Sequence, residues 1–305
     1  MPSKETEEIG KMSGCTMCPR RCGVNRETGT GACGCGAELK VARAALHMWE
    51  EPCISGTRGS GTVFFSGCPL HCIFCQNRAI SDGKAGKVIT GERLSEIFLE
   101  LQEKGAANIN LVTPGHYAPQ AAAALGKAKT AGLTLPVICN TGGYESREAL
   151  EMLAGVTDVW LPDLKYLNAE TARNFSHAPD YPEIAKAAID FMVEKTGELS
   201  FSDDGYVKKG VIVRHLVLPG HVEESKEIIQ YLHDRYGGRI WVSIMNQYTP
   251  PAEKLPYPEL NRKLTSYEYK KVVDFALSIG MENAYIQEGG TAKESFIPAF
   301  DCEGV

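Results

Sequence analysis

The chain has 305 residues, of which 43% are hydrophobic and 23% are charged, a mixture typical of a globular protein with a sizeable core. Its formal net charge of −6 gives no general attraction to nucleic acid or to anionic membranes, so neither is expected as a partner. The N-terminal residues lack the apolar stretch of a signal peptide, and no run approaches the ~20 apolar residues of a membrane span. We therefore expect a soluble, cytoplasmic protein.

The cysteines are concentrated at one end of the sequence. Nine of the eleven fall within the first 75 residues, and only Cys139 and Cys302 lie beyond. In a reducing compartment such clustering indicates metal or iron–sulfur ligation rather than disulfides. Cys139 and Cys302 are expected to be structural, while Cys53 either supports a metal site or packs.

Three regions follow one another along the chain. Residues 1–56 form a Cys- and Gly-rich extension expected to fold around a metal. Residues 57–250 alternate short apolar runs with amphipathic helices, and residues 251–305 add a Pro-rich stretch, a helix and a last strand. The predicted strands cover 62–66, 108–112, 136–140, 158–161, 211–217, 240–244 and 284–287.

Capping residues indicate where several helices begin. Ser146 is a predicted N-cap, and two pairs have the spacing of a capping box: Asp180 with Glu183, and Thr265 with Glu268. Alternating strands and helices imply an α/β fold with a parallel sheet of about six strands in the central region. Periodicity does not distinguish an open sheet from a curved partial barrel.

The central motif contains Cys68, Cys72 and Cys75 and follows the strand at 62–66. Active sites of βα folds assemble at this end of parallel strands. Three thiolates leave one iron of a [4Fe–4S] cluster open, whereas an electron-transfer cluster uses four. The open iron can bind S-adenosylmethionine (SAM) through its amino and carboxylate groups. Half of a zinc site is the alternative, but His71 is poorly placed to share a centre with the adjacent Cys72.

This Cys-x3-Cys-x2-Cys loop, with Phe74 before its last cysteine, resembles the radical SAM superfamily. The run GSGTVFFSGCPLHCIFCQN is similar to pyruvate formate-lyase activating enzymes. The segments CPRRCGVNR, EEPCISG, TPGHYAP, PDLKYL, RHLVLPGH and MNQYTP are similar to relatives that carry an N-terminal cysteine segment. The resemblance implies a partial (βα)6 TIM-like barrel with a Cys-rich N-terminal extension and a short C-terminal α/β extension, with SAM laid across the strand ends.

The resemblance also implies which residues contact SAM. They come from the ends of predicted strands and from the cysteine loop, and are Phe74, Asn140, Thr141, Gly142, Asp163, Lys165, Arg214 and His215. At least one of Arg214 and His215 should face the cleft, because alternating strand residues point to opposite sides. Thr113-Pro114-Gly115-His116 stands where activating enzymes have Gly-Gly-Glu. His116 is therefore either a functional group or a structural histidine.

The N-terminal cysteines predict a second metal centre. Cys15, Cys18, Cys22 and Cys33 are the predicted ligands, with Cys35 as a substitute for one of them. Four thiolates suit a second [4Fe–4S] cluster or a tetrahedral zinc equally well, and the redox setting favours the cluster. Arg20 and Arg21 are expected to offset its charge.

The predicted function is reductive cleavage of SAM to a 5′-deoxyadenosyl radical that abstracts hydrogen from a substrate. By resemblance, the substrate is a glycyl residue of a partner enzyme, and a flavodoxin or ferredoxin supplies electrons. Activating enzymes place an acidic residue before Gly-Pro-Gly, whereas this chain has Arg58-Gly59-Ser60-Gly61. Modification of a small molecule or another peptide is therefore an alternative. An iron–sulfur electron carrier without catalysis is a third hypothesis.

Overall fold

A computed structural model of the chain describes residues 14–287 and 297–305. The strands are β1 (Lys40–His47), β2 (Ser60–Phe65), β3 (Lys87–Val88), β4 (Ile109–Val112), β5 (Val137–Thr141), β6 (Val159–Pro162), β7 (Ser200–Phe201), β8 (Val207–Leu216), β9 (Trp241–Met245) and β10 (Ala284–Ile286). The α-helices are α2 (Pro52–Ser55), α3 (Arg78–Ser81), α4 (Gly91–Glu103), α5 (Ala118–Thr130), α6 (Arg147–Ala154), α7 (Ala169–Ser176), α8 (Tyr181–Thr196), α9 (Val222–Tyr236) and α10 (Ser266–Ser278). Short 3₁₀ turns lie at Gly115–Tyr117, Gly237–Arg239 and Pro258–Asn261.

The described strands form one mostly parallel sheet in the order β10-β9-β8-β6-β5-β4-β2-β1-β3, with β7 paired to β8. Every neighbouring pair from β2 to β10 along this order is parallel. Since parallel neighbours need crossover connections, helices occupy most of the intervening segments. The α/β fold predicted from the alternating pattern is confirmed.

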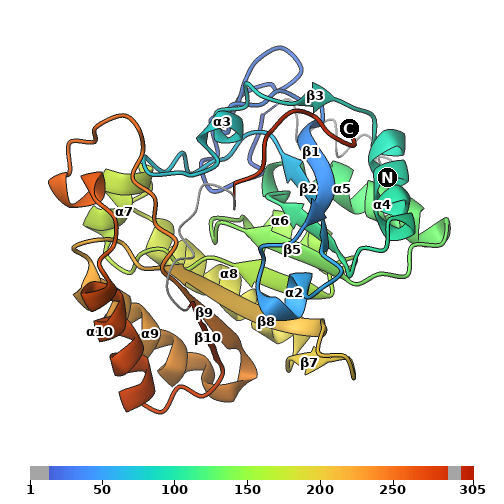
Figure 1. Cartoon of the computed structure of the whole chain (residues 1–305). Helices are drawn as coiled ribbons and strands as arrows, with labels where there is room; N and C mark the ends of the chain where they lie inside the picture. Colours follow the sequence, from blue (N-terminus) through green and yellow to red (C-terminus); the bar gives the residue numbers. More distant parts are fainter. Residues whose placement is uncertain (1–13, 288–296) are drawn as a thin grey trace.

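Helices cover the outer side of the sheet (Figure 1). Along the chain α4 packs on α5, α5 on α6 and α6 on α8, while α9 packs on α10. Strands covered on both faces should be apolar throughout, and every residue of β2, β5 and β6 is buried. No helix within the described residues is long and apolar enough to cross a membrane.

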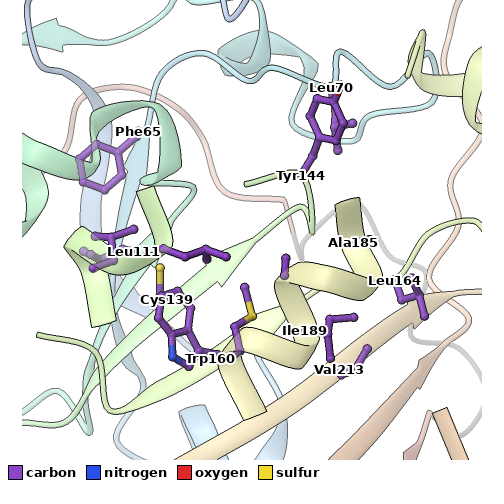
Figure 2. Packing of buried hydrophobic residues seen from close by; sticks show 14 of the residues in the cluster. Phe65, Leu70, Leu111, Cys139, Tyr144, Trp160, Leu164, Ala185, Ile189 and Val213 are labelled. Atoms are coloured by element: carbon purple, nitrogen blue, oxygen red, sulfur yellow. The ribbon is translucent and has the colours of Figure 1, made fainter. Parts of the chain in front are cut away.

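Large side chains from the strands fill the space beneath these helices. Figure 2 shows Leu111, Cys139 and Trp160 beside one another, with Ile189 of α8 nearby. Cys139 is fully buried and Trp160 is only 1% exposed. Cys139 is therefore a small apolar residue of the core, as expected.

The C-terminal end of the chain meets β1, which lies inside the segment expected to be a Cys-rich extension. β1 pairs antiparallel with β2, so the main sheet continues into residues 40–47. The C-terminal residues return to the same strand: Cys302 N–H donates to Ala42 O at 3.0 Å, and Ala44 N–H donates to Glu303 O at 2.8 Å.

Two of the three predicted helix caps are present. The Ser146 hydroxyl accepts a hydrogen bond from Ala149 N–H, and Thr265 and Glu268 form the complete capping box. Asp180 is the N-cap residue of α8, but the capping box predicted with Glu183 was wrong, because the Asp180 side chain makes no cap bond. Its carboxylate instead accepts a hydrogen bond from the Tyr144 hydroxyl at 2.9 Å.

Candidate active site

The cysteine loop leaves β2 at Gly67, a position that only glycine can occupy. Its φ is +87°, and a Cβ there would lie 2.3 Å from the Cys35 sulfur and 2.6 Å from Cys33 O. Beyond this turn Cys68 N–H donates to Cys33 O, and Cys75 N–H donates to Cys72 O, each at 3.0 Å. The loop is thus held against the N-terminal segment at its start and folded on itself at its end.

The three cysteines of the loop line one pocket at the carboxyl ends of the parallel strands. This pocket has a volume of about 150 Å³ and is also lined by Asn140, Thr141, Gly142, Asp163, Lys165 and Arg214. The structure therefore brings together the cysteines and most of the side chains that sequence reasoning assigned to SAM. These residues come from the ends of four different elements, β2, β5, β6 and β8.

Arg214 is the centre of a buried polar network in this pocket. Its guanidinium donates to Asp163 Oδ1 at 3.0 Å, to Asn140 Oδ1 at 2.6 Å and to Glu50 Oε2 at 3.2 Å. Asp163 also pairs with Lys165, and Glu50 accepts from Asn110 Nδ2 at 3.1 Å. A buried charge requires such partners, because desolvation would otherwise disfavour its ionised form.

The pKa shifts follow from this arrangement. Burial opposes ionisation of Asp163, but the charges of Arg214 and Lys165 outweigh it and lower the pKa of that carboxyl. Burial likewise opposes protonation of Lys165, yet Asp163 and then Cys72 raise its pKa above the ordinary value. Asp163 and Lys165 are therefore ionised at neutral pH, ready to contact a charged or hydroxyl-bearing ligand.

The three thiols fit a [4Fe–4S] cluster, which the structure, carrying no ligands, does not itself contain. Burial, followed by the neighbouring thiols, raises the pKa of Cys68 to about 12, and burial with Cys72 raises that of Cys75 to about 11. Thiolates in this setting need a bound cation to be stable. Ser176 Oγ donates to Cys72 Sγ at 3.0 Å, so the site also offers a hydrogen bond to a thiolate. Within residues 14–287 and 297–305, no three side chains converge on the position of a single metal ion.

Phe74 and Arg214 line a pocket beside the cysteines, whereas His215 does not. Phe74 and Arg214 both line a second pocket of about 200 Å³ that adjoins the first and shares Cys72 and Cys75 with it. His215 is buried on the opposite face of β8, where its ring contacts Leu164 O at 2.8 Å and Ser225 Oγ at 2.9 Å. The prediction that it binds the cofactor was wrong, because strand alternation directs Arg214 and His215 to opposite sides.

His116 lies behind the cysteine loop rather than in either pocket. Its ring is 2% exposed, and Nε2 bonds Ser66 O at 2.8 Å, which makes Nε2 the protonated nitrogen. Of the two interpretations left open by the sequence, this position supports the structural one.

Three residues of the site were missed by sequence reasoning: Glu50, Asn110 and Tyr181. The Tyr181 hydroxyl accepts from Lys165 N–H at 3.0 Å and contacts Gly142 O and Asp163 O at 2.9 and 2.8 Å. It therefore fixes the backbone of two site segments from the first position of α8. For Glu50, the available signal was the acidic pair before Pro52, since a buried carboxylate needs a basic partner elsewhere.

The second pocket extends away from the cysteines toward the surface. Its outer lining includes Trp49, Gln76 and Gln247, and the Gln76 amide donates to Gln247 O. Trp49 is 54% exposed, and Met48 beside it is 42% exposed. The two pockets therefore form one continuous cleft that runs from the cysteines to the surface.

Comparison with known proteins agrees with this geometry. Residues 62–246 match the family described as the radical SAM superfamily, and the chain belongs to that family. An uncharacterized protein of Methanocaldococcus jannaschii is 30% identical over 288 residues, which is 91% of this chain and 79% of that protein.

Solved structures share the fold at low sequence identity. A radical SAM methyltransferase from Sphaerobacter thermophilus has a TM-score of 0.53 and 15% identity, with coverage of 76% of this chain and 67% of that one. Streptococcus suis SuiB bound to its precursor peptide SuiA has a TM-score of 0.52 and 12% identity, with coverage of 73% and 47%. This chain thus spans about half the length of SuiB.

Proposed function

We propose that this protein cleaves SAM reductively and uses the resulting 5′-deoxyadenosyl radical to abstract hydrogen from a polypeptide substrate. The observation that carries the proposal is that Cys68, Cys72 and Cys75 line one pocket together with Asn140, Asp163 and Lys165. A [4Fe–4S] cluster, when bound, supplies the electron that splits the sulfonium of SAM. Electrons would come from a small redox protein such as a flavodoxin or ferredoxin.

The protein's own residues would bind the cluster, orient SAM and exclude water from the site. Cys68, Cys72 and Cys75 would hold the cluster through their thiolates, and because they are three, the cluster could also bind SAM. Asp163 is suited to a hydroxyl or a cation of SAM, and Lys165 to its carboxylate. Phe74, 6% exposed, packs between Phe175 and Tyr248 with ring centroids 6.3 and 6.0 Å away, and this apolar wall limits access of water to the radical.

A polypeptide substrate is supported by the surface beside the second pocket. Leu46, Met48 and Trp49 are exposed there, and a Cβ on Gly59 would lie 2.7 Å from the Met48 sulfur. This surface therefore adjoins Arg58-Gly59-Ser60-Gly61, the stretch that corresponds to the peptide-handling region of activating enzymes. A glycyl Cα hydrogen of a partner enzyme is the first candidate, and another peptide is the second.

Modification of a small molecule is the competing function. Asn140, Asp163, Lys165 and Arg214 also line the 200 Å³ pocket, so part of its charge faces the space beside the SAM-binding side. A compact polar substrate would be held by these groups without help from the exposed apolar surface.

The first experiment measures 5′-deoxyadenosine after anaerobic reconstitution, reduction with dithionite and addition of SAM. We expect the wild type to form the product and Cys72→Ala to form none. Cys139→Ser is the matched control, because this cysteine lies in the core away from both pockets. Product formation by folded Cys72→Ala, or none from cluster-loaded wild type, would contradict the proposal.

The second experiment separates the substrate classes. Reduced protein and SAM are mixed with candidate partner enzymes, and the sample is examined by electron paramagnetic resonance for a glycyl radical. Substitution of Trp49 by Ala should weaken the signal if the exposed surface receives a polypeptide. Activity on a small molecule that Trp49→Ala leaves unchanged would favour the competing function.

A further inference from the structure

The N-terminal cysteines lie behind the cysteine loop, which carries Cys68, Cys72 and Cys75 and is called the catalytic loop from here on. Cys22 and Cys33 sulfurs lie 3.5 and 3.6 Å from the position that a Cβ on Gly31 would take, so the two thiols face one small space. Cys18 lies within electrostatic range of Cys15, Cys22 and Cys33, and Cys15 lies within range of Cys22 and Cys33. Residues separated by up to 18 positions in the sequence thus bring four thiols close to one another.

Cys35 points out of this group. Its sulfur donates to Ser66 O at 3.2 Å and lies under Gly67, the glycine that begins the catalytic loop. Although it contacts Cys33, its position is set by the end of β2. Cys35 thus lies at the edge of the group, between the Cys33 thiol and the end of β2.

A buried cation beside the thiols has an unsatisfied donor. Arg26 is 4% exposed; its Nε donates to Gly36 O at 2.9 Å and its Nη1 to His116 O at 2.6 Å. Its Nη2 is buried and has no hydrogen-bond partner among the described residues. Cys15 and Cys33 lie within electrostatic range of this guanidinium. A buried charge with a spare donor indicates an anionic neighbour, which four metal-bound thiolates would provide.

Of the two arginines expected to offset the charge of this site, Arg20 also connects parts of the structure. Arg20 donates to the backbone carbonyls of Pro69, Ser176 and His177, and so ties the N-terminal segment to the catalytic loop and to the end of α7. Two further bonds make the same connection: His71 Nε2 to Ala32 O at 2.7 Å, and Cys68 N–H to Cys33 O at 3.0 Å. Cys33 therefore contributes its sulfur to the group of thiols, and its backbone carbonyl accepts a hydrogen bond from the catalytic loop.

We propose that Cys15, Cys18, Cys22 and Cys33 bind a second iron–sulfur cluster directly behind the catalytic loop, with Arg26 as its counter-charge and with Cys35 outside the ligand set. Four protein thiolates complete the coordination of a [4Fe–4S] cluster. Such a centre has no open iron, and its direct connection to Cys68 means that it supports the loop that carries the catalytic thiols. It does not depend on the proposed chemistry of SAM.

The test begins with a variant that lacks the catalytic thiols, Cys68→Ala/Cys72→Ala/Cys75→Ala. The protein is reconstituted anaerobically with iron and sulfide, and iron, zinc and acid-labile sulfide are counted. We expect about four irons and four sulfides per chain. One zinc without sulfide, or a folded protein without iron, would overturn the proposal. Neither result depends on SAM cleavage, so failure here is distinct from failure of the proposed function.

A matched pair of further substitutions tests the ligand set. In the same background Cys18→Ala should lose the iron, and Cys35→Ala should keep it. The reverse pattern would overturn the assignment. Circular dichroism and gel filtration establish that each variant is folded. If any variant fails to fold, the wild type decides, because it should hold about eight irons with the second cluster and about four without it.

Discussion

Asp163 forms ion pairs with Lys165 and Arg214. Its role in SAM binding can be tested against His215, a buried residue on the opposite face of β8. Substitution of Asp163 by Asn removes the charge that orients Lys165 and Arg214. We therefore expect SAM affinity to fall roughly tenfold, which corresponds to about 1.4 kcal/mol. Anaerobic equilibrium dialysis of the reconstituted protein measures it. His215→Gln is the control, since His215 faces away from the pocket, and its SAM affinity should stay within about twofold of wild type. Unchanged binding by Asp163→Asn would contradict the assignment.

Glu145 makes stability depend on pH. It is 6% exposed, its Oε2 has no partner among the described residues, and burial raises its pKa from 4.5 to about 7. The folded state then holds a proton that the unfolded state has lost, so stability falls as pH rises from about 4.5 to 7, by about 3 kcal/mol in total.

Replacement of Glu145 by Gln should remove this loss. Relative to wild type, the variant should melt at a similar temperature near pH 4.5 and at a higher temperature at pH 8. Thermal unfolding of the metal-loaded protein measures the difference at each pH. Glu103→Gln, on an exposed residue, should show no such trend. A melting difference that does not grow with pH would mean that Glu145 is ionised in the folded protein.

Sequence motifs identify site residues when the chemistry is local to a short segment. Cys68, Cys72 and Cys75 are recognisable from spacing, and Asp163 and Lys165 from their place at a strand end and the resemblance of their motif. Glu50 reaches the same network from a position 164 residues before Arg214. No local pattern encodes such a pairing, because β8 and the segment that follows β1 are far apart in the sequence and are not neighbours in the sheet.

At the scale of elements, the Ser146 hydroxyl makes two hydrogen bonds whose contribution to stability one substitution can measure. Its hydroxyl caps α6 and also donates to Met17 O at 2.7 Å, which joins the helix to the N-terminal segment. Ser146→Ala should cost about 1 kcal/mol for the cap and about another 1 kcal/mol for the second bond.

Thr90 offers a matched comparison at the start of α4. Its side chain accepts a hydrogen bond from Arg93 N–H, and it has no second bond of this kind to a distant segment among those described. Thr90→Ala should therefore be the milder change. Thermal unfolding of the two variants tests this, and equal losses would show that the Met17 contact adds nothing.

The six strands predicted for the parallel sheet correspond to β2, β4, β5, β6, β8 and β9, and the last predicted strand corresponds to β10, with differences at their ends. Most of these strands are short and largely buried, so their apolar runs are easy to recognise. β1 was missed because its sequence, KVARAALH, is rich in helix-forming residues and its register shifts between Val41 and Arg43. β3 and β7 have two residues each, which is too short for any periodicity.

At the scale of the whole molecule, the sequence could not place the first 56 residues relative to the barrel strands. The cysteine spacing predicted a metal-binding segment, but contact with the catalytic loop depends on Arg20, His71 and the carbonyl of Cys33. Backbone carbonyls carry no sequence signal. These hydrogen bonds, which no sequence pattern predicts, join the N-terminal segment to the loop that carries Cys68, Cys72 and Cys75.

The C-terminal residues lie along β1, and this contact can be removed. Besides the two backbone bonds, Arg43 pairs with Asp301 and with Glu303, and a Cβ on Gly304 would lie only 2.1 Å from Ala44 O. Deletion of residues 300–305 should free the backbone groups of Ala42 and Ala44 that these bonds satisfy. We expect the shortened protein to self-associate at micromolar concentration, as measured by light scattering, while a Gly304→Ala variant should be destabilised and remain less associated.

The C-terminal residues thus cover an edge of β1 that would otherwise expose unpaired backbone groups. An uncovered edge strand is a template on which another polypeptide can add a strand. Natural folds protect such edges with covering segments and charged side chains. Here the covering residues include Asp301 and Glu303, which pair with Arg43 of β1 and so hold the cover in place. This cover should therefore keep two copies of the protein from pairing through β1.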